Sequence, residues 1–183
     1  LNVYRDYANL RMNLIPYIYQ EASNAAENYE PMMRPLIYDY PDDKYLKNIE
    51  DQYLFGRSML VAPIVEKDSR QRKIYLPAGE WIDFWNGREY QGNQQIKYLA
   101  DLEKIPVFVK NNSVIPLNLN DDFEIGNFIG NDLEEYKRLT FWINGNIEKY
   151  TFEDDLNNKI ILTQSGNKIK ADFNGCLKEI YII

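Results

Sequence analysis

Acidic side chains are the residues with the clearest capacity for chemistry in this sequence, and they occur in groups. The groups are Asp42-Asp43, Glu50-Asp51, Asp101 with Glu103, Asp121-Asp122 and Glu153-Asp154-Asp155. Two carboxyl groups can cleave a glycosidic bond when one acts as general acid and the other is an ionised nucleophile or base. Neighbouring residues of a strand point to opposite faces, however, so adjacent acids rarely form such a pair. We interpret Asp42-Asp43 and Asp121-Asp122, which lie in turn-like polar surroundings, as caps or solvated turns, and we predict no catalytic residue.

Metal and imidazole chemistry is poorly supported by the composition. The chain of 183 residues has no histidine and one cysteine, Cys176, which excludes an internal disulfide, an imidazole base and a histidine or cysteine metal cage. The acidic loop around Asp155 and Asn157 partly matches a calcium loop, but Lys159 follows and the glycine of that pattern is missing. A loop of turn-forming residues explains it equally well. We therefore predict neither a metal nor a cofactor.

Arg34 is a single charged residue in an apolar stretch, between Met32-Met33 and Pro35-Leu36. A guanidinium in such surroundings is expected to be partly buried, and a buried charge requires a partner. We predict Asp51, which precedes the apolar run Gln52 to Gly56, as that partner. The expected ion pair would clamp the connector after the first helix onto the first strand.

Aromatic residues are abundant, with 15 tyrosines, 8 phenylalanines and 3 tryptophans making up 14% of the chain. Trp81, Phe84, Trp85 and Tyr90 surround a turn expected at Asn86-Gly87. An exposed group of this kind would stack on sugars, whereas a buried group would join two sheets. Burial is the commoner outcome. The alternative is a stand-alone carbohydrate-binding β-sandwich, in which Trp81, Trp85 and Tyr90 contact the sugar.

Charge and hydropathy exclude two classes of partner. Because 21 basic residues face 28 acidic ones, the net charge is -7, whereas a phosphate backbone requires a basic face. No stretch reaches the ~18 apolar residues of a membrane span, and no signal peptide opens the chain.

The free thiol of Cys176 favours a reducing, cytoplasmic location. Because Leu1 stands in place of an initiator methionine, we expect a mature product, an internal fragment or an incomplete chain.

Residues 3 to 28 carry the sustained helical period of the sequence. Pro16 lies inside the pattern and lacks a backbone donor, so we expect a kink near residues 12–16. No other segment has a comparable period, so we expect the apolar stripe to need a partner from outside the sequence, or to drive self-association in its absence. The stripe comprises Val3, Tyr7, Leu10, Leu14, Tyr17, Ile18, Ala22 and Ala25.

From residue 29 the pattern changes to short strands separated by turns. Three prolines between Tyr29 and Asp43 forbid a regular helix and favour an extended, turning connector. Hairpin turns are expected at Asn144-Gly145-Asn146 and Ser165-Gly166-Asn167. Turn residues at such regular spacing predict a mainly β chain with an antiparallel sandwich. The expected strands are 58–65, 72–76, 81–85, 95–99, 107–109, 114–117, 139–143, 147–152, 159–163, 168–173 and 177–182, and the expected divisions of the chain are 1–57, 58–120 and 121–183.

Seven segments in one order resemble glycoside hydrolase family 31, the family of α-glucosidases and α-xylosidases. They are residues 10–19 (LRMNLIPYIY), 31–36 (PMMRPL), 51–56 (DQYLFG), 60–64 (LVAPI), 75–81 (YLPAGEW), 105–110 (IPVFVK) and 112–117 (NSVIPL). The signature residues within them are Pro16, Arg34, Pro35, Asp51, Gln52, Gly56 and Pro63. Beyond residue 117 the likeness rests on β character and on Phe152 to Asp155, after which the family often has glycine and this chain has Leu156.

The resemblance implies the C-terminal part of a retaining, exo-acting α-glycosidase that hydrolyses O-glycosyl bonds. The kinked helix would be the last helix of a (β/α)8 barrel, whose missing remainder is the implied partner, and the strands from about residue 58 would form a β-sandwich beside it. In this family an aspartate nucleophile forms a covalent glycosyl-enzyme, and a second aspartate is acid and then base. Both motifs lie upstream of the matched segments, as does the histidine of the sugar site. The expected role of this chain is therefore structural, and the carbohydrate substrate belongs to the parent protein.

Overall fold

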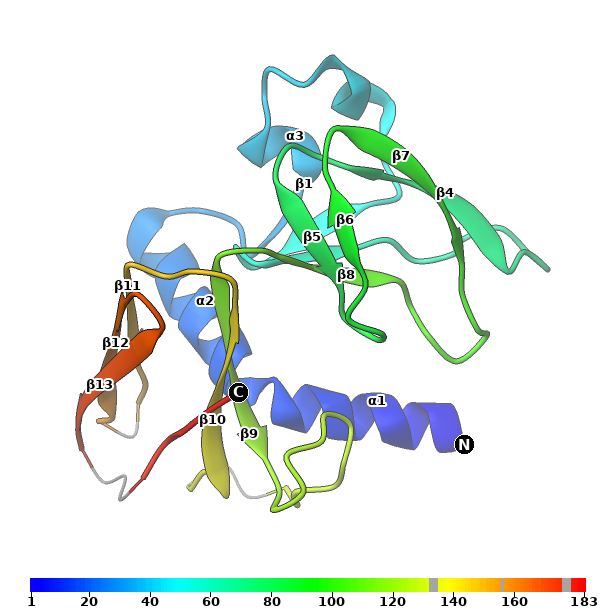
Figure 1. The fold of residues 1–183 in the computed structure, drawn as a ribbon. Helices are drawn as coiled ribbons and strands as arrows, with labels where there is room; N and C mark the ends of the chain where they lie inside the picture. The colour runs from blue at the N-terminus through cyan, green and yellow to red at the C-terminus, as the bar shows by residue number, and fades with distance from the viewer. Residues whose placement is uncertain (132–134, 156, 176–178) are drawn as a thin grey trace. The chain divides into compact units, whose positions relative to one another are not determined.

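The computed structural model describes residues 1–131, 135–155, 157–175 and 179–183, and its fold is mainly β, as predicted (Figure 1). The chain forms two compact units. Unit 1 combines Leu1–Asn28 with Asn112–Ile183, and unit 2 is the continuous segment Tyr29–Asn111. The predicted divisions after residues 57 and 120 do not coincide with these limits. Outside the described residues lie Leu156, Cys176 and the start of the strand expected at 177–182.

Unit 2 contains a six-stranded sheet and a separate two-stranded sheet. Its elements are β1 (Met33–Pro35), α3 (Leu36–Asp39), the 3-10 helix η1 (Lys44–Asn48), β2 (Tyr53–Phe55), β3 (Met59–Val61), β4 (Gln71–Leu76), β5 (Glu80–Asp83), β6 (Glu89–Gln91), β7 (Gln94–Leu99) and β8 (Val107–Lys110). The large sheet has the order β1-β2-β3-β8-β5-β6, the small sheet pairs β4 with β7, and every pair is antiparallel. The proline-rich connector is therefore not simply extended, because it contains a strand, a helical turn and a 3-10 helix.

The core of unit 2 is formed by apolar side chains from both of its sheets. Leu60, Ile74 and Phe108 are completely buried, and Trp81 is nearly so. β3 is buried along its whole length, which fits the continuous apolar run that its sequence shows. The turn predicted at Asn86-Gly87 connects β5 to β6, where Gly87 has a φ of 70° that glycine adopts without strain. This turn is confirmed.

Unit 1 is a sandwich of two three-stranded sheets joined to a helical segment. Its elements are α1 (Asn2–Asn13), α2 (Ile15–Asn28), β9 (Ser113–Leu119), β10 (Arg138–Asn144), β11 (Lys149–Glu153), β12 (Lys159–Ser165), β13 (Lys168–Asn174) and β14 (Tyr181–Ile182). The sheets have the orders β14-β10-β9 and β11-β12-β13, and their pairs are antiparallel except β10 with β14. Phe141 from one sheet and Phe152 from the other are buried edge to face, with ring centroids 5.6 Å apart. The two sheets thus share one core.

The helical segment breaks close to its proline. α1 and α2 are separated at Leu14, which confirms the kink predicted near residues 12–16. Pro16 lies in the first turn of α2, where a missing N–H leaves no helical hydrogen bond unmade. The expectation that the stripe lacks a partner within the chain is wrong, because α2 packs on β9 and leaves Leu14 and Tyr17 only 8% and 1% exposed. A sheet covers this stripe instead of a second helix, since a sheet face can also bury an amphipathic helix.

One of the two hairpins predicted in unit 1 forms. Ser165 pairs with Lys168 across Gly166-Asn167, and Gly166 has a φ of 57°, so β12 and β13 make a two-residue hairpin. The hairpin predicted at Asn144-Gly145-Asn146 is wrong, because β10 and β11 belong to different sheets. The chain turns there as expected, but it passes from one layer of the sandwich to the other.

Candidate functional site

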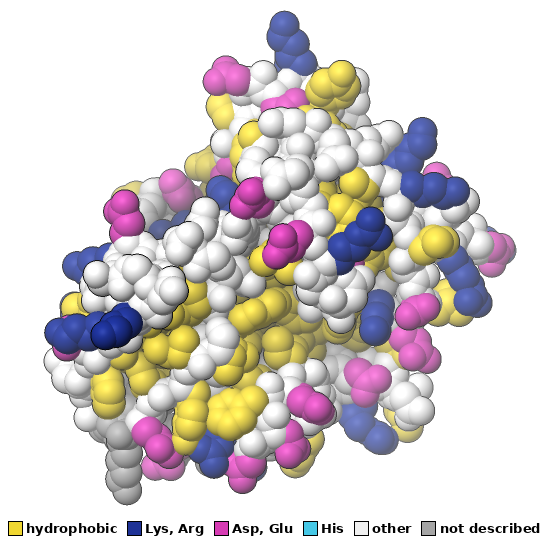
Figure 2. All heavy atoms as spheres, in the orientation of Figure 1, with side chains coloured by type: hydrophobic (Ala, Val, Ile, Leu, Met, Phe, Trp, Pro, Cys, Tyr) yellow, Lys and Arg dark blue, Asp and Glu magenta, His cyan; other side chains and the backbone are white. Residues whose placement is uncertain are grey.

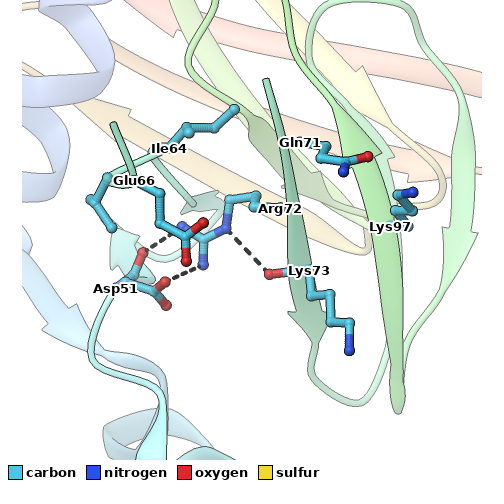
Figure 3. A pocket seen from close by; sticks show the side chains of 8 residues that line it. Asp51, Ile64, Glu66, Gln71, Arg72, Lys73 and Lys97 are labelled. Atoms are coloured by element: carbon cyan, nitrogen blue, oxygen red, sulfur yellow. Dashed lines mark hydrogen bonds and ion pairs between the residues drawn. The ribbon is translucent and has the colours of Figure 1, made fainter. Parts of the chain in front are cut away.

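Arg72 lies at the edge of a hollow on unit 2 (Figure 3). The hollow has a volume of about 520 Å³ and is lined by Asp51, Ile64, Val65, Glu66, Gln71, Arg72, Lys73 and Lys97. The guanidinium of Arg72 pairs with the Asp51 carboxylate at 2.7 Å. It also donates to the main-chain oxygens of Asp51, Pro63 and Lys73. Because these bonds are internal, Arg72 acts as a clamp that joins three segments of the chain.

The predicted ion pair between Arg34 and Asp51 is wrong. Arg34 is 5% exposed, as expected for a guanidinium in an apolar stretch, but it pairs with Asp39 through Nε at 2.6 Å and Nη2 at 2.9 Å. This bidentate pair forms because α3 folds Asp39 back toward the strand that carries Arg34. The carboxylate of Asp51 pairs with Arg72 instead. The apolar surroundings thus predicted a buried, paired arginine, but not its partner.

Gln52 completes the edge of the small sheet of unit 2. Its side chain donates to the main-chain oxygen of Tyr75 at 2.8 Å and accepts from the Tyr75 N–H at 3.0 Å. The residue is buried, and an unpaired main-chain group at such a place costs about 1–3 kcal/mol. The Tyr75 hydroxyl donates to Asp43 at 2.7 Å, and burial together with this carboxylate raises the pKa of Tyr75 to about 12. Gln52 and Asp43 therefore fasten the connector to β4.

The other signature residues of unit 2 also occupy structural positions. Gly56 follows β2 with a φ of 63°, and its N–H donates to the main-chain oxygen of Met32 at 2.8 Å. Pro35 ends β1 and precedes α3 with a φ of -64°, the value that its ring imposes. Pro63 follows β3 and accepts a hydrogen bond from Arg72. All three lie at or just after the end of a strand, where the backbone changes direction.

Asp83 is a buried carboxylate that the sequence patterns did not reveal. It is 0% exposed and accepts from the Trp85 N–H at 2.8 Å, the Asn86 side chain at 3.0 Å and the Tyr98 hydroxyl at 2.7 Å. Burial together with this carboxylate raises the pKa of Tyr98. Asp83 therefore organises the turn between β5 and β6. The signal that could have found it is a charged residue inside an aromatic run, the same kind of signal that identified the buried arginine.

The three predicted sugar-contact residues differ in their exposure. Trp81 is 1% exposed, and its indole N–H donates to the main-chain oxygen of Pro77 at 2.9 Å, so this side chain belongs to the core. Trp85 is half-buried and donates to the main-chain oxygen of Ile105 at 2.6 Å. Tyr90 is also half-buried and packs against the core of unit 2. A sugar contact through Trp85 and Tyr90 stays a prediction.

Charged side chains of both signs are visible on the drawn face of the chain (Figure 2). Figure 2 shows one face of the molecule, on which Lys and Arg side chains are interspersed with Asp and Glu. In the described part of the chain, no helix has both the length and the apolar character needed to cross a membrane.

Comparison with known proteins gives a consistent set of relatives. The family model described as "Glycosyl hydrolase family 31 C-terminal domain" matches residues 29–115, which include all of unit 2. An isomaltosyltransferase of Sporosarcina globispora is 41% identical over 84% of this chain and 14% of its own length. An α-glucosidase of Saccharolobus solfataricus is 32% identical over 97% of this chain and 21% of its own length. The chain thus spans about a seventh to a fifth of these curated relatives.

Solved structures are similar over the same range. The cycloalternan-forming enzyme of Listeria monocytogenes has a TM-score of 0.82 and 39% identity, over 89% of this chain and 16% of that enzyme. An α-xylosidase of Xanthomonas citri has a TM-score of 0.74 and 28% identity, over 97% of this chain and 20% of that enzyme. The similarity therefore continues beyond residue 117, where the motif likeness was thin. Together these matches confirm the resemblance carried by the seven ordered segments: residues 29–115 match the C-terminal domain of glycosyl hydrolase family 31, and the chain is similar to a small part of several members of that family.

Proposed function

We propose that this chain is the C-terminal, non-catalytic portion of a retaining, exo-acting α-glycosidase, an α-glucosidase or α-xylosidase that hydrolyses O-glycosyl bonds. The observation that carries the proposal is the similarity to an α-glucosidase along 97% of the chain. The isomaltosyltransferase fits the same chemistry, because a retaining enzyme can pass its glycosyl group to water or to a sugar hydroxyl. The free thiol of Cys176 is the reason for proposing a cytoplasmic location.

Three acids of unit 2 have partners within the unit, which supports a structural role. Asp39 and Asp51 pair with arginines, and Asp83 accepts three hydrogen bonds in the interior. A retaining glycosidase requires two carboxyl groups about 5–5.5 Å apart that flank the scissile bond and exchange protons or bonds with the substrate. A carboxylate that arginine or buried donors already saturate is poorly suited to that task. We therefore place catalysis in a (β/α)8 barrel of the same polypeptide, which is the proposed partner of this chain.

A turnover assay tests this proposal. The purified chain is incubated with an aryl α-glucoside and, separately, an aryl α-xyloside, and release of the phenol is followed. We expect no turnover above the rate without protein, and measurable turnover by the chain alone would overturn the proposal. The residues encoded immediately before Leu1 give a second test, because they should contain the barrel and its two aspartates. An open reading frame that lacks them would also contradict the proposal.

The start of the helical segment is the proposed contact with the barrel. Leu14 and Tyr17 are covered within unit 1, whereas Leu1 and Tyr4 are 96% and 78% exposed. Exposed apolar side chains of this kind favour association, so we expect this exposed end of the helical segment to drive self-association when the barrel is absent. Light scattering should show dimers or larger species, and Tyr4→Asp should shift the population toward the monomer. A monomeric wild-type chain would contradict this expectation.

A further inference from the structure

Three asparagine–glycine pairs occur in the chain, at Asn86-Gly87, Asn144-Gly145 and Asn174-Gly175. Such a pair is prone to spontaneous deamidation, because glycine has no Cβ to hinder attack by its main-chain nitrogen on the asparagine side chain. As bare dipeptides the three pairs are equally reactive. The fold distinguishes them, because it places the three side chains in different surroundings.

Asn86-Gly87 is protected by hydrogen bonds on the groups that would react. The Asn86 Nδ2 group donates to the Asp83 carboxylate at 3.0 Å, and its Oδ1 accepts from the Arg88 N–H at 2.9 Å. The Gly87 N–H donates to the main-chain oxygen of Asp83 at 2.9 Å. These bonds fix the amide and direct the attacking nitrogen away from it, so they must break before the two groups can meet. Breaking them should slow the reaction at least about tenfold.

Asn144-Gly145 is protected by burial of its asparagine. Asn144 is 6% exposed, and it ends β10, the central strand of its sheet, opposite Ser113 of β9. Its Nδ2 group is itself buried. Deamidation releases ammonia and consumes water at the side chain, so a buried amide of this kind reacts slowly.

Asn174-Gly175 has neither form of protection. Asn174 is exposed and ends β13, an edge strand that pairs with β12 on one side only. Its side chain makes no hydrogen bond to another of the residues that the structure describes. Gly175 is also exposed and leaves the strand with a φ of 119°, which glycine adopts readily. The Asn174 amide is therefore open to water and can rotate toward the Gly175 nitrogen.

We propose that Asn174 is a site of spontaneous deamidation in the folded chain, and that the other two pairs are preserved by the fold. A base removes the proton of the Gly175 N–H, and the nitrogen attacks Asn174 Cγ. The side-chain nitrogen leaves as ammonia, and a succinimide ring closes. Water then opens the ring at one of its two carbonyl groups, giving aspartate or isoaspartate. No oxidant, reductant or enzyme is needed.

Isoaspartate at this position would disturb the packing of unit 1, because it lengthens the main chain directly before Gly175. A Cβ built on Gly175 would lie 2.5 Å from the main-chain oxygen of Asn157 and 2.7 Å from Asn158 Oδ1, so the fit is already tight. Asn158 is 3% exposed and donates to Asp154 from its main chain and side chain at 2.9 and 3.0 Å. A lengthened main chain does not preserve this fit, so the isoaspartate form should melt at a lower temperature.

Peptide mapping of the aged full chain tests the proposal, because trypsin places each pair in its own peptide. The peptides are residues 74–88, 139–149 and 171–178. The folded chain is incubated at mildly alkaline pH and digested, and the mass and retention time of each peptide are followed against an unaged sample. We expect peptide 171–178 to convert at least about tenfold faster than the other two. Asn174→Gln should abolish this conversion and leave the other two peptides unchanged.

A parallel incubation in guanidinium chloride is the control, because the three peptides should convert at similar rates once the fold is lost. Conversion of peptide 74–88 or 139–149 in the folded chain at the rate of peptide 171–178 would overturn the proposal. So would an unchanged peptide 171–178 in the folded chain while all three convert in guanidinium chloride. A thermal melt of the converted wild type that matches the melt of Asn174→Gln would overturn the packing effect but not the site.

Discussion

Replacing Asp83 with alanine should strongly destabilise unit 2, because three donors lose their acceptor at once. The carboxylate is fully buried and accepts from the Trp85 N–H, the Asn86 side chain and the Tyr98 hydroxyl. A hydrogen bond to a charged group contributes about 1.5–3 kcal/mol to the free energy of unfolding. Since bonds of one network are not additive, we expect a loss of about 4 kcal/mol, below the sum of three bonds. Asp83→Asn keeps one acceptor oxygen and the side-chain shape, so its loss should be about half as large.

Urea denaturation followed by tryptophan fluorescence measures this loss. Trp81 and Trp85 both lie in unit 2, and a Trp142→Phe background removes the tryptophan of unit 1, so the signal then reports unit 2 alone. Asp42→Ala is the control, because Asp42 is an exposed acid of the same unit. If Asp83→Ala unfolds within about 1 kcal/mol of that control, the reasoning is refuted, since water would then satisfy the three donors equally well.

Three further predictions concern the same unit. Gln52→Ala should lower the free energy of unfolding by about 2 kcal/mol, because the main-chain N–H and C=O of Tyr75 lose their partners, and Gln52→Glu should not recover the loss, because it buries a carboxylate against the Tyr75 carbonyl oxygen. Alkaline pH should destabilise unit 2: the pKa of Tyr75 is raised from 10.0 to about 12, so its contribution is complete below pH ~10 and is lost as the pH rises through about 12. Tyr75→Phe should flatten the fall of the urea midpoint over that range, and an unchanged slope would assign the effect to another group. Gly92→Ala should disrupt the segment between β6 and β7, because a Cβ there would lie 1.9 Å from the main-chain oxygen of Pro77, and a thermal melt identical to that of the wild type would contradict this.

Local patterns predicted most elements of the fold, but not how the sheets are assembled. The turns at Gly145 and Gly166 show why, because both glycines have positive φ and both turns are rich in turn-forming residues. Only the second is followed by a strand that pairs with the one before it. Pairing depends on which faces are buried together at long range, and a short window of sequence does not carry that information. The helical stripe was misjudged for the same reason, since its partner β9 is about 90 residues away in sequence.

Whether a charged side chain is buried was also easier to predict than which residue it pairs with. The apolar neighbours of Arg34 correctly indicated a buried guanidinium, but Asp39 became its partner only through the fold of α3. Acids that occur in groups are the pattern expected of a catalytic pair, whereas the acid that unit 2 buries completely, Asp83, lies in an aromatic-rich run. A single charge in an apolar run is the better signal, because burying it is costly unless the fold supplies its donors.

Unit 1 joins segments that are far apart in the chain, and this affects folding during synthesis. α2 is synthesised before unit 2, but β9, which covers its apolar face, follows only after the roughly 80 residues of unit 2 have been made. At about 5–20 residues per second, the helix waits some 4 to 16 seconds for its partner. Unit 2 is continuous, and small domains fold in less than about a second, so it can be complete within that interval. A pause in translation before residue 112 would therefore leave a folded unit 2 preceded by a helix with its apolar face open to chaperones.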